Sequence, residues 1–332
     1  MSTNTQNHRE DRSRAAKPHS NLLPGMVVIL LLAIPLLWLG IHGYLQHKRI
    51  ERLRDMHARF NAEPRRMARV HNALMATLGP RAAMPFRDVV SLVIERQPVS
   101  VDDARWLQEF PELTALHLLD VGLTDDHLEP ISEMTHLRAL ALRGPSITDR
   151  GFARLGRLTN LRQIMLRESE LTGASYRHLA GLPNLTTLTI EGGRLGKDGI
   201  GNLAALPALH RLELHYAPGR TVDLEHLHRL PTLTSLTLEA DTLPPGIIDD
   251  IARVRTLRGL TLIGPEVTDE DLRTLQSLPD LKRLAMYDVV VSQAAVDAFR
   301  QARPDCRLEG KRRRVRTESG SAADSERSTA PR

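Results

Sequence analysis

A leucine recurs every 24 residues through most of this 332-residue chain, without an insertion or a deletion. The series is Leu113, Leu137, Leu161, Leu185, Leu209, Leu233, Leu257 and Leu281. Each leucine opens a six-residue pattern with apolar residues at its first, fourth and sixth positions. A fixed period of this length means that one supersecondary unit is stacked again and again, so the chain folds as a solenoid.

The pattern inside one unit predicts a short strand followed by a short helical segment. Counted from the first leucine, apolar residues at positions 4 and 6 alternate with polar ones, as in a strand. Apolar residues at positions 16, 19 and 22 recur every third residue, as on one face of a short helix. The strands then align in parallel, and the bulkier helical side makes the sheet the concave face.

Turn and cap residues separate the two elements. Thr124, Thr148 and Thr268 are each followed by Asp and can cap the helical segment with a side-chain oxygen. Proline at position 23 of several units ends that segment before the next strand.

These residues resemble the leucine-rich repeat family, whose consensus contains L-x-x-L-x-L. The resemblance covers residues 89–308, about nine repeats, and the Thr-Asp-x-x-Leu stretches look like the short repeats of bacterial members. It implies an α/β solenoid, a curved leucine-rich-repeat horseshoe with a parallel concave sheet. It also implies a binding module rather than an enzyme.

Charge is uneven along the chain. Residues 89–308 carry 24 Lys and Arg against 30 Asp and Glu, whereas the whole chain has a net charge of +5. The basic surplus therefore belongs to the flanks, and we expect no nucleic-acid partner for the repeats. Arg outnumbers Lys 40 to 5, which indicates a bacterial origin, and a single cysteine excludes disulfides within the chain.

The N-terminal flank predicts a membrane anchor. Residues 1–21 form a polar tail, and residues 22–45 form a transmembrane helix whose first 20 residues carry no charge. Trp38 and Tyr44 lie near one end, where aromatic side chains favour the interface. The alternative is a cleaved signal peptide, but residues 41–48 lack its small-x-small site.

The side of the membrane is poorly determined, because four basic residues precede the predicted helix and five follow it closely. An extracytoplasmic repeat domain is favoured only because a short cytoplasmic tail before an anchor is the commonest arrangement.

The two segments that flank the repeats, residues 46–88 and residues 309–332, each allow two interpretations. Residues 46–88 predict a basic helical stalk or N-terminal cap, with Ile50, Leu53 and Phe60 on one face. Residues 309–332 predict a disordered tail that begins basic and becomes Ser-rich. The basic run at the beginning of this tail is either a solvated segment or a site that binds anionic lipid or nucleic acid.

No catalytic signature stands out. The glycine-rich stretch 192–199 lacks the spacing and the Ser or Thr of a phosphate loop. His210, His215, His226 and His228 share one region, but two of them point to opposite faces of a strand. We therefore predict no enzyme, no cofactor, no metal site and no small-molecule substrate.

Side chains at positions 3, 5 and 7 of each unit face the concave side, and they supply the predicted binding residues. Arg143 and Arg167 lie on adjacent strands, where they either bind a partner carboxylate or form a self-satisfying ladder with Glu191. The candidates are His117, Arg143, Met165, Arg167, Glu191, Glu213, His215, Glu239 and Tyr287. A second candidate is the rim formed by residues 215–221 and 243–246.

These observations predict a membrane-anchored module that binds an unknown protein through its concave face. The alternative is a structural scaffold of the cell envelope without a discrete ligand.

Overall fold

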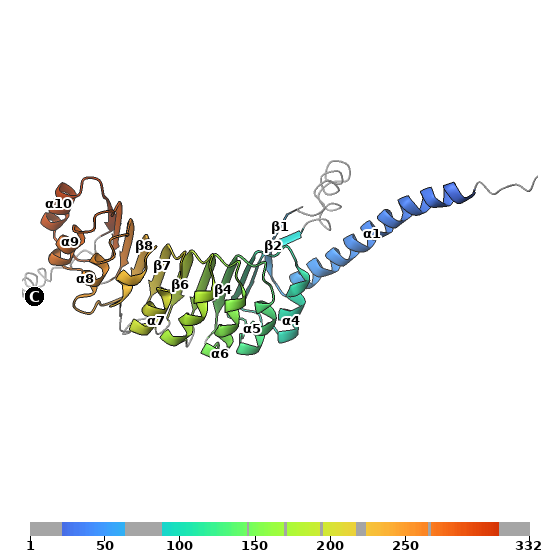
Figure 1. Ribbon diagram of the computed structural model, residues 1–332, viewed down its shortest axis with the longest axis horizontal. Helices are drawn as coiled ribbons and strands as arrows, with labels where there is room; N and C mark the ends of the chain where they lie inside the picture. The colour runs from blue at the N-terminus through green and yellow to red at the C-terminus, as the bar shows by residue number, and fades with distance from the viewer. Residues whose placement is uncertain are drawn as a thin grey trace, which may run out of the picture.

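The computed structural model of the protein describes residues 22–63, 88–144, 146–168, 171–192, 195–216, 224–264 and 267–311. Side chains are described from Leu37 onward, except those of Lys197 and Lys311. Within these residues the chain forms a long solenoid with a helix projecting from its N-terminal end (Figure 1).

One sheet runs the whole length of the solenoid, with its strands in chain order from β1 to β11. Strands β2 to β11 are parallel, and each residue pairs with the residue 24 places later, as Leu140 does with Ile164. The predicted period is therefore the register of the sheet. The strands are β1 (Arg59–Glu63), β2 (Asp88–Glu95), β3 (Ala115–Leu119), β4 (Ala139–Arg143), β5 (Gln163–Arg167), β6 (Thr187–Glu191), β7 (Arg211–His215), β8 (Ser235–Glu239), β9 (Gly259–Ile263), β10 (Arg283–Tyr287) and β11 (Arg307–Lys311).

Short helices follow the strands and lie together along the opposite side of the solenoid (Figure 1). Some units use α-helix and others 3₁₀-helix, because three apolar residues at every third position suit either. The α-helices are α1 (Leu22–Asp55), α4 (Val101–Trp106), α5 (Asp125–Ser132), α6 (Asp149–Phe152), α7 (Gly196–Leu203), α8 (Ile247–Ala252), α9 (Asp269–Leu275) and α10 (Gln293–Ala302). The 3₁₀-helices are η2 (Leu107–Glu109), η3 (Ala153–Arg157), η4 (Gly173–Gly181) and η5 (Leu227–Arg229).

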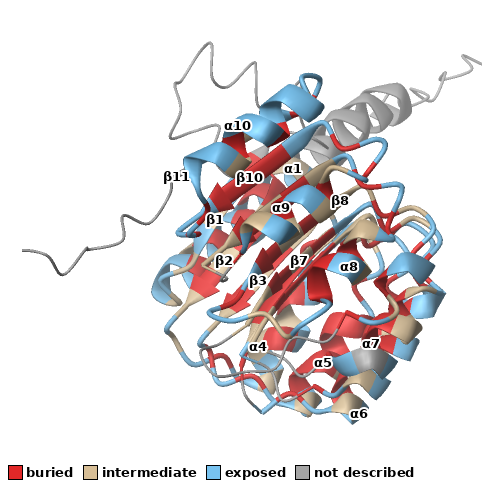
Figure 2. Cartoon of the chain, turned by 90° about the vertical axis from the view of Figure 1, so that its left-hand side faces the viewer, coloured by how far each residue is buried: buried red, intermediate tan, exposed pale blue. Residues whose placement is uncertain are grey.

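The core is one continuous apolar column between the sheet and the helices. It runs from Leu53 at the end of α1 to Cys306 before β11. The first leucine of every unit is at most 1% exposed. Along most strands buried residues alternate with half-buried or exposed ones, and in β4, β6 and β10 the three central residues are all buried (Figure 2). No unit closes this column alone, so each unit depends on its neighbours for burial.

Aspartates tie neighbouring units together at the start of the helical segments. The carboxylate of Asp125 accepts hydrogen bonds from the backbone N–H and the hydroxyl of Thr148, at 2.8 and 2.6 Å. Asp149 accepts the same pair of bonds from Thr172. The Thr-Asp dipeptides therefore do more than cap their own helix, because each Asp also holds the next unit's turn.

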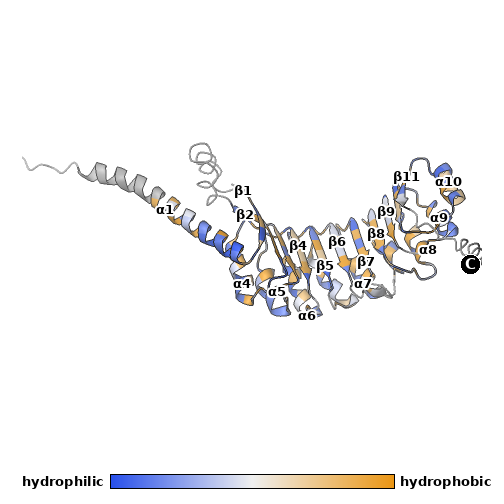
Figure 3. Ribbon diagram, turned by 180° about the vertical axis from the view of Figure 1, so that it is seen from behind, coloured by the Kyte–Doolittle hydropathy of each residue, from blue (hydrophilic) through white to orange (hydrophobic). Residues whose placement is uncertain are grey.

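The end of α1 covers the first repeat. Ile50 and Leu53 are buried against it, and Arg49 and Arg52 form ion pairs with Glu109 and Asp103. The Cζ atom of Arg52 also lies 4.2 Å from the centre of the Trp106 ring, a cation–π contact. Figure 3 shows that hydrophilic residues dominate α1 where it meets the solenoid.

The prediction of a longer helical stalk is wrong for residues 56–63. The helix ends in a turn in which His57 adopts the left-handed conformation, with φ 51°. Phe60, predicted on the helical face of Ile50, lies instead in β1, which pairs antiparallel with β2. A strand here satisfies the open hydrogen-bonding edge of β2, which a helix cannot do. The second half of the predicted stalk, residues 64–87, lies outside the described residues.

The predicted tail also begins later than the composition indicated. Glu309, Gly310 and Lys311 belong to β11, which pairs in parallel with β10. Arg283 on β10 forms an ion pair with Glu309, so this polar residue is held in the sheet. Residues 312–332 lie outside the described residues.

Among the described residues, the structure contains no helix with the length and apolarity needed to cross a membrane. The side chains of residues 22–36, most of the predicted anchor, are not among those described.

Close backbone packing in the middle of the solenoid leads to a first prediction. A Cβ added to Gly173 would lie 2.7 Å from the backbone nitrogen of Gly199, whereas one added to Gly201 in α7 meets nothing within 4 Å. We expect Gly173→Ala to destabilise the protein by about 1–3 kcal/mol through overpacking. Gly201→Ala should leave it unchanged or stabilise it by up to about 1 kcal/mol. Urea unfolding of the two variants measures the difference, and equal midpoints would contradict the close approach of η4 and α7.

Candidate functional site: the concave face

The concave face is the outer surface of β2–β11, opposite the helices (Figure 1). The third, fifth and seventh residues of each unit point outward, and the fourth and sixth are buried, as in β3 and β7. This alternation is what a strand imposes on successive side chains. The predicted binding residues therefore lie on strands of one rigid sheet rather than on loops.

Arg143, at the end of β4, is held between two carboxylates from the neighbouring units. Its Nε lies 3.2 Å from Oδ1 of Asp120, and its Nη2 donates to Oε1 of Glu168 at 2.5 Å. The hydrogen bond from Arg143 is the main reason that the pKa of Glu168 lies below its ordinary value. The guanidinium of Arg143 is therefore already paired within the protein.

The pairing continues along the same row of strand ends. Arg167 donates from Nε to Oε2 of Glu191 on the next strand. Further along, Nδ1 of His215 lies 2.6 Å from Oε2 of Glu239. We call the row Arg143, Arg167, Glu191, His215 and Glu239 the charged strip. Arg167 thus pairs with Glu191, as the ladder interpretation requires, whereas Arg143 pairs instead with Asp120 and Glu168. The docking role stays a prediction.

Glu213 lies on β7, two residues before His215 of the charged strip, and accepts a hydrogen bond from the hydroxyl of Thr189 at 3.0 Å. Thr189 is 4% exposed, so this bond satisfies a hydroxyl that the sheet almost buries. The role of Glu213 in the structure is therefore partly local.

The remaining predicted residues lie on β3, β5 and β10. His117 on β3 and Met165 on β5 are half-buried and flank the buried Ala141 on β4. Burial lowers the pKa of His117, which favours its neutral form at pH 7. Tyr287 on β10 is 36% exposed. Seven strand spacings separate β3 from β10, about 34 Å, so the nine residues form a strip and not one pocket.

A recurring backbone feature follows the strands, and sequence reasoning missed it. Asp120, Glu168 and Asp288, each at position 8 of its unit, have φ of 57°, 48° and 57°, and Gly192 and Gly264 occupy the same position with φ 79°. This left-handed residue turns the chain away from the sheet. The signal was available, because Gly or Asp recurs at position 8 in the sequence.

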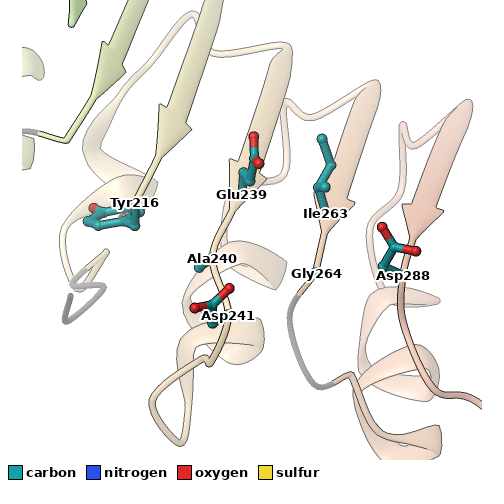
Figure 4. Close-up of a pocket in the computed structure, with 7 residues that line it drawn as sticks. All are labelled: Tyr216, Glu239, Ala240, Asp241, Ile263, Gly264 and Asp288. Atoms are coloured by element: carbon teal, nitrogen blue, oxygen red, sulfur yellow. The ribbon is translucent and has the colours of Figure 1, made fainter. Parts of the chain in front are cut away.

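A hollow of about 430 Å³ lies where β8, β9 and β10 end (Figure 4). Of the residues around it, Glu239 was predicted on the concave face and Tyr216 in the rim of residues 215–221. The lining residues are Tyr216, Glu239, Ala240, Asp241, Ile263, Gly264 and Asp288.

The other features singled out in the sequence have structural explanations where they are described. His210 contacts its own backbone at Ala208, and His215 contacts Glu239, so these two side chains point to different partners. In the described part of the chain, no three His, Cys, Asp or Glu side chains are placed to hold a metal ion. Residues 217–223 of the predicted rim lie outside the described residues. Gly246 of its other half precedes α8 with φ 85°.

The chain was compared with protein-family profiles, with curated protein sequences and with solved structures. No protein-family profile matches the chain, and no curated protein matches its sequence. Among solved structures, an internalin (inlF) from Listeria monocytogenes str. 4b F2365 is 20% identical with a TM-score of 0.48, over 74% of this chain and 70% of that one. Internalin C2 from the same organism is 22% identical with a TM-score of 0.43, over 67% and 92%. TLR13, in a complex with ssRNA13, is 16% identical with a TM-score of 0.51, over 68% of this chain and 32% of TLR13.

This chain has the leucine-rich repeat fold. The in-phase parallel sheet and the match to TLR13, of which the chain spans about a third, confirm the fold that the sequence resemblance implied. In a leucine-rich repeat solenoid of this kind, the charged strip follows from the position-7 residues of consecutive repeats. One residue per repeat then sets the chemistry along the face.

The pairing of Arg143 leads to a second prediction. Arg143→Gln should raise the pKa of Glu168 toward its ordinary value, because the charged hydrogen bond is lost. In the wild-type protein, the lowered pKa means that this carboxylate adds stability above its ordinary pKa, which is lost as the pH falls through the lowered value. An NMR titration of the Glu168 carboxyl measures the shift. Arg154→Gln, which removes an ion pair with Glu129 on the helical side, serves as the control. Identical Glu168 titrations in wild type and Arg143→Gln would contradict the pairing.

Proposed function

We propose that this protein is a membrane-anchored binding module that recruits or senses another protein through its concave face, and that it is not an enzyme. The observation that carries the proposal is the charged strip on a sheet face that lies opposite the helices (Figure 1). Arg and His at interfaces give orientation and specificity through complementary charge. The leucine-rich repeat fold, which is commonly used for protein–protein interaction, supports this class of function.

In the proposed contact, the arginines of the charged strip exchange carboxylates of this chain for an acidic group of the partner. Because Arg143 and Arg167 already bind carboxylates of this chain, an acidic group on the partner must compete with Glu168 and Glu191. Such pairs at a solvated surface are weak, so the competition is feasible. His117, Met165, Glu213 and Tyr287 complete the proposed surface as side contacts.

The proposed membrane anchor rests on α1. Residues 22–41 carry no charge, and α1 continues without a break from this stretch into the cap of the first repeat. At the described end of the stretch, Leu37, Trp38, Ile41, Tyr44 and Leu45 are all exposed large apolar side chains. Apolar surface gathered in this way on one helix needs a cover, and lipid is the cover that we propose. We place the repeats on the extracytoplasmic side, because a short cytoplasmic tail before an anchor is the commonest arrangement.

The anchor gives a third prediction. Membranes washed in alkaline carbonate should retain the chain at full length, because an apolar helix stays in the bilayer when peripheral proteins are released. Replacing Leu30, Leu32 and Ile34 by Lys should move the protein to the soluble fraction. The matching exchange of Arg54, Arg59 and Arg96 for Lys, which keeps their charge, should not. Full-length wild-type protein in the supernatant, or a mature N-terminus near residue 45, would refute the anchor. Protease shaving of intact cells tests the side of the membrane.

The concave face gives a fourth prediction. Arg143→Glu with Arg167→Glu should reduce affinity for a captured protein partner at least about tenfold, as loss of charged hot spots does. The thermal midpoint should change little, since neither side chain belongs to the apolar core. Arg177→Glu with Arg229→Glu makes the same charge change on the helical side and should bind as wild type does.

The wild-type interaction should also weaken as salt rises. Equal affinity of the two double variants would remove the charged strip from the binding surface. A wild-type chain that captures only itself or envelope material, with no saturable partner, would favour the scaffold function.

A further inference from the structure

We call the residues that follow the C-terminal ends of β8, β9 and β10 the strand exits. These exits combine exposed apolar side chains with acidic side chains that no described Lys or Arg pairs with. Outside α1, the exposed large apolar residues of the described chain are Tyr287 and Val290, at 36% and 49%. They flank Asp288, which lines the 430 Å³ hollow described above (Figure 4). Exposed apolar groups concentrated at one place on a soluble domain mark a contact surface.

Two of the three carboxylates around the hollow, Asp241 and Asp288, have no described Lys or Arg partner, and the third, Glu239, contacts His215. Elsewhere on the same face the acidic residues do have basic partners, as Glu191 has Arg167. The exposed sheet end at β8–β10 is therefore suited to a ligand that is both basic and partly apolar.

The chain supplies such a ligand at the adjacent strand. Lys311, the last residue of β11, pairs in register with Tyr287 of β10. The sequence that leaves β11 is Lys-Arg-Arg-Arg-Val-Arg, residues 311–316, with four arginines and one valine after the strand. It leaves at the edge of the sheet where Asp288 and the hollow lie, one strand spacing away.

The reach is sufficient. Three strand spacings separate β11 from β8, about 14 Å at about 4.8 Å each. Five residues in extended conformation span about 17 Å. Residues 312–316 are thus long enough to cross the exits of β10 and β9 and reach Asp241 after β8.

We propose that residues 312–316 dock across the exits of β8–β10, with their guanidinium groups on Asp241 and Asp288. The docked segment covers Tyr287 and the Glu239 end of the charged strip. The proposal stands on strand register and charge and does not depend on the proposed protein partner.

The test uses full-length protein in detergent micelles and a fluorescein-labelled peptide of residues 310–319. A variant in which Arg312, Arg313, Arg314 and Arg316 are changed to Gln should bind the peptide, measured by anisotropy. Wild type should bind it at least about tenfold more weakly, because its own tail competes at high effective concentration. Binding to the tail variant should weaken as salt screens the charges.

Matched substitutions locate the site. In the tail variant, Asp241→Lys with Asp288→Lys should abolish peptide binding. Asp280→Lys, an exposed acid at the opposite edge of the β10 repeat, should not. Unchanged thermal unfolding in each variant shows that the fold is retained. Equal peptide affinity of wild type and tail variant would overturn docking of the chain's own tail. Binding that survives the double Asp substitution would overturn the site.

Discussion

Burial of leucines between neighbouring repeats is the interaction on which the rest of this structure depends. A single unit has a five-residue strand and a helical segment of a few residues, too little to enclose its own apolar side chains. Leu137, Leu161 and Leu185 are fully buried because the next unit repeats the same positions 24 residues later. Aspartate bonds such as Asp125 to Thr148 then fix the spacing on the helical side. The concave face inherits its regularity from this column.

A stack of this kind has two ends, and the chain closes them differently. At the first repeat, α1 supplies Ile50 and Leu53 as a lid, and β1 completes the edge of β2. At the last repeat, α10 completes the unit that begins at Leu281 and β11 adds half a unit, and Phe299 and Cys306 finish the core. Burial raises the pKa of the Cys306 thiol, so that the thiol stays protonated and acts as a small apolar residue. One end is thus closed by a helix that lies outside the repeat pattern, and the other by an incomplete repeat.

The fold was predictable because it rests on periodicity, which a single sequence displays directly. The register of Leu140 with Ile164 follows from counting, and so does the outward direction of Arg143 and Arg167. What could not be counted was missed. The strand β1 forms because the edge of β2 has unsatisfied hydrogen-bonding groups. Residues 59–63 have no counterpart in the 24-residue repeat, so the period gives no signal for this strand. The carboxylates that bind Arg143 come from position 8, where a left-handed backbone at Asp120 and Glu168 redirects the side chains. Side-chain direction after a strand depends on φ, which leucine spacing does not specify.

The continuity of α1 has a geometric consequence. One helix carries both the apolar stretch and the lid of the first repeat, with no linker between them. Each residue of an α-helix turns the chain by about 100° and advances it by about 1.5 Å. The number of residues between Tyr44 and Ile50 therefore sets how far the concave face is rotated about the axis of α1, relative to the apolar stretch of the helix. An insertion of one residue there would swing the whole sheet by more than a quarter turn, while an insertion of seven would return it almost to its original bearing.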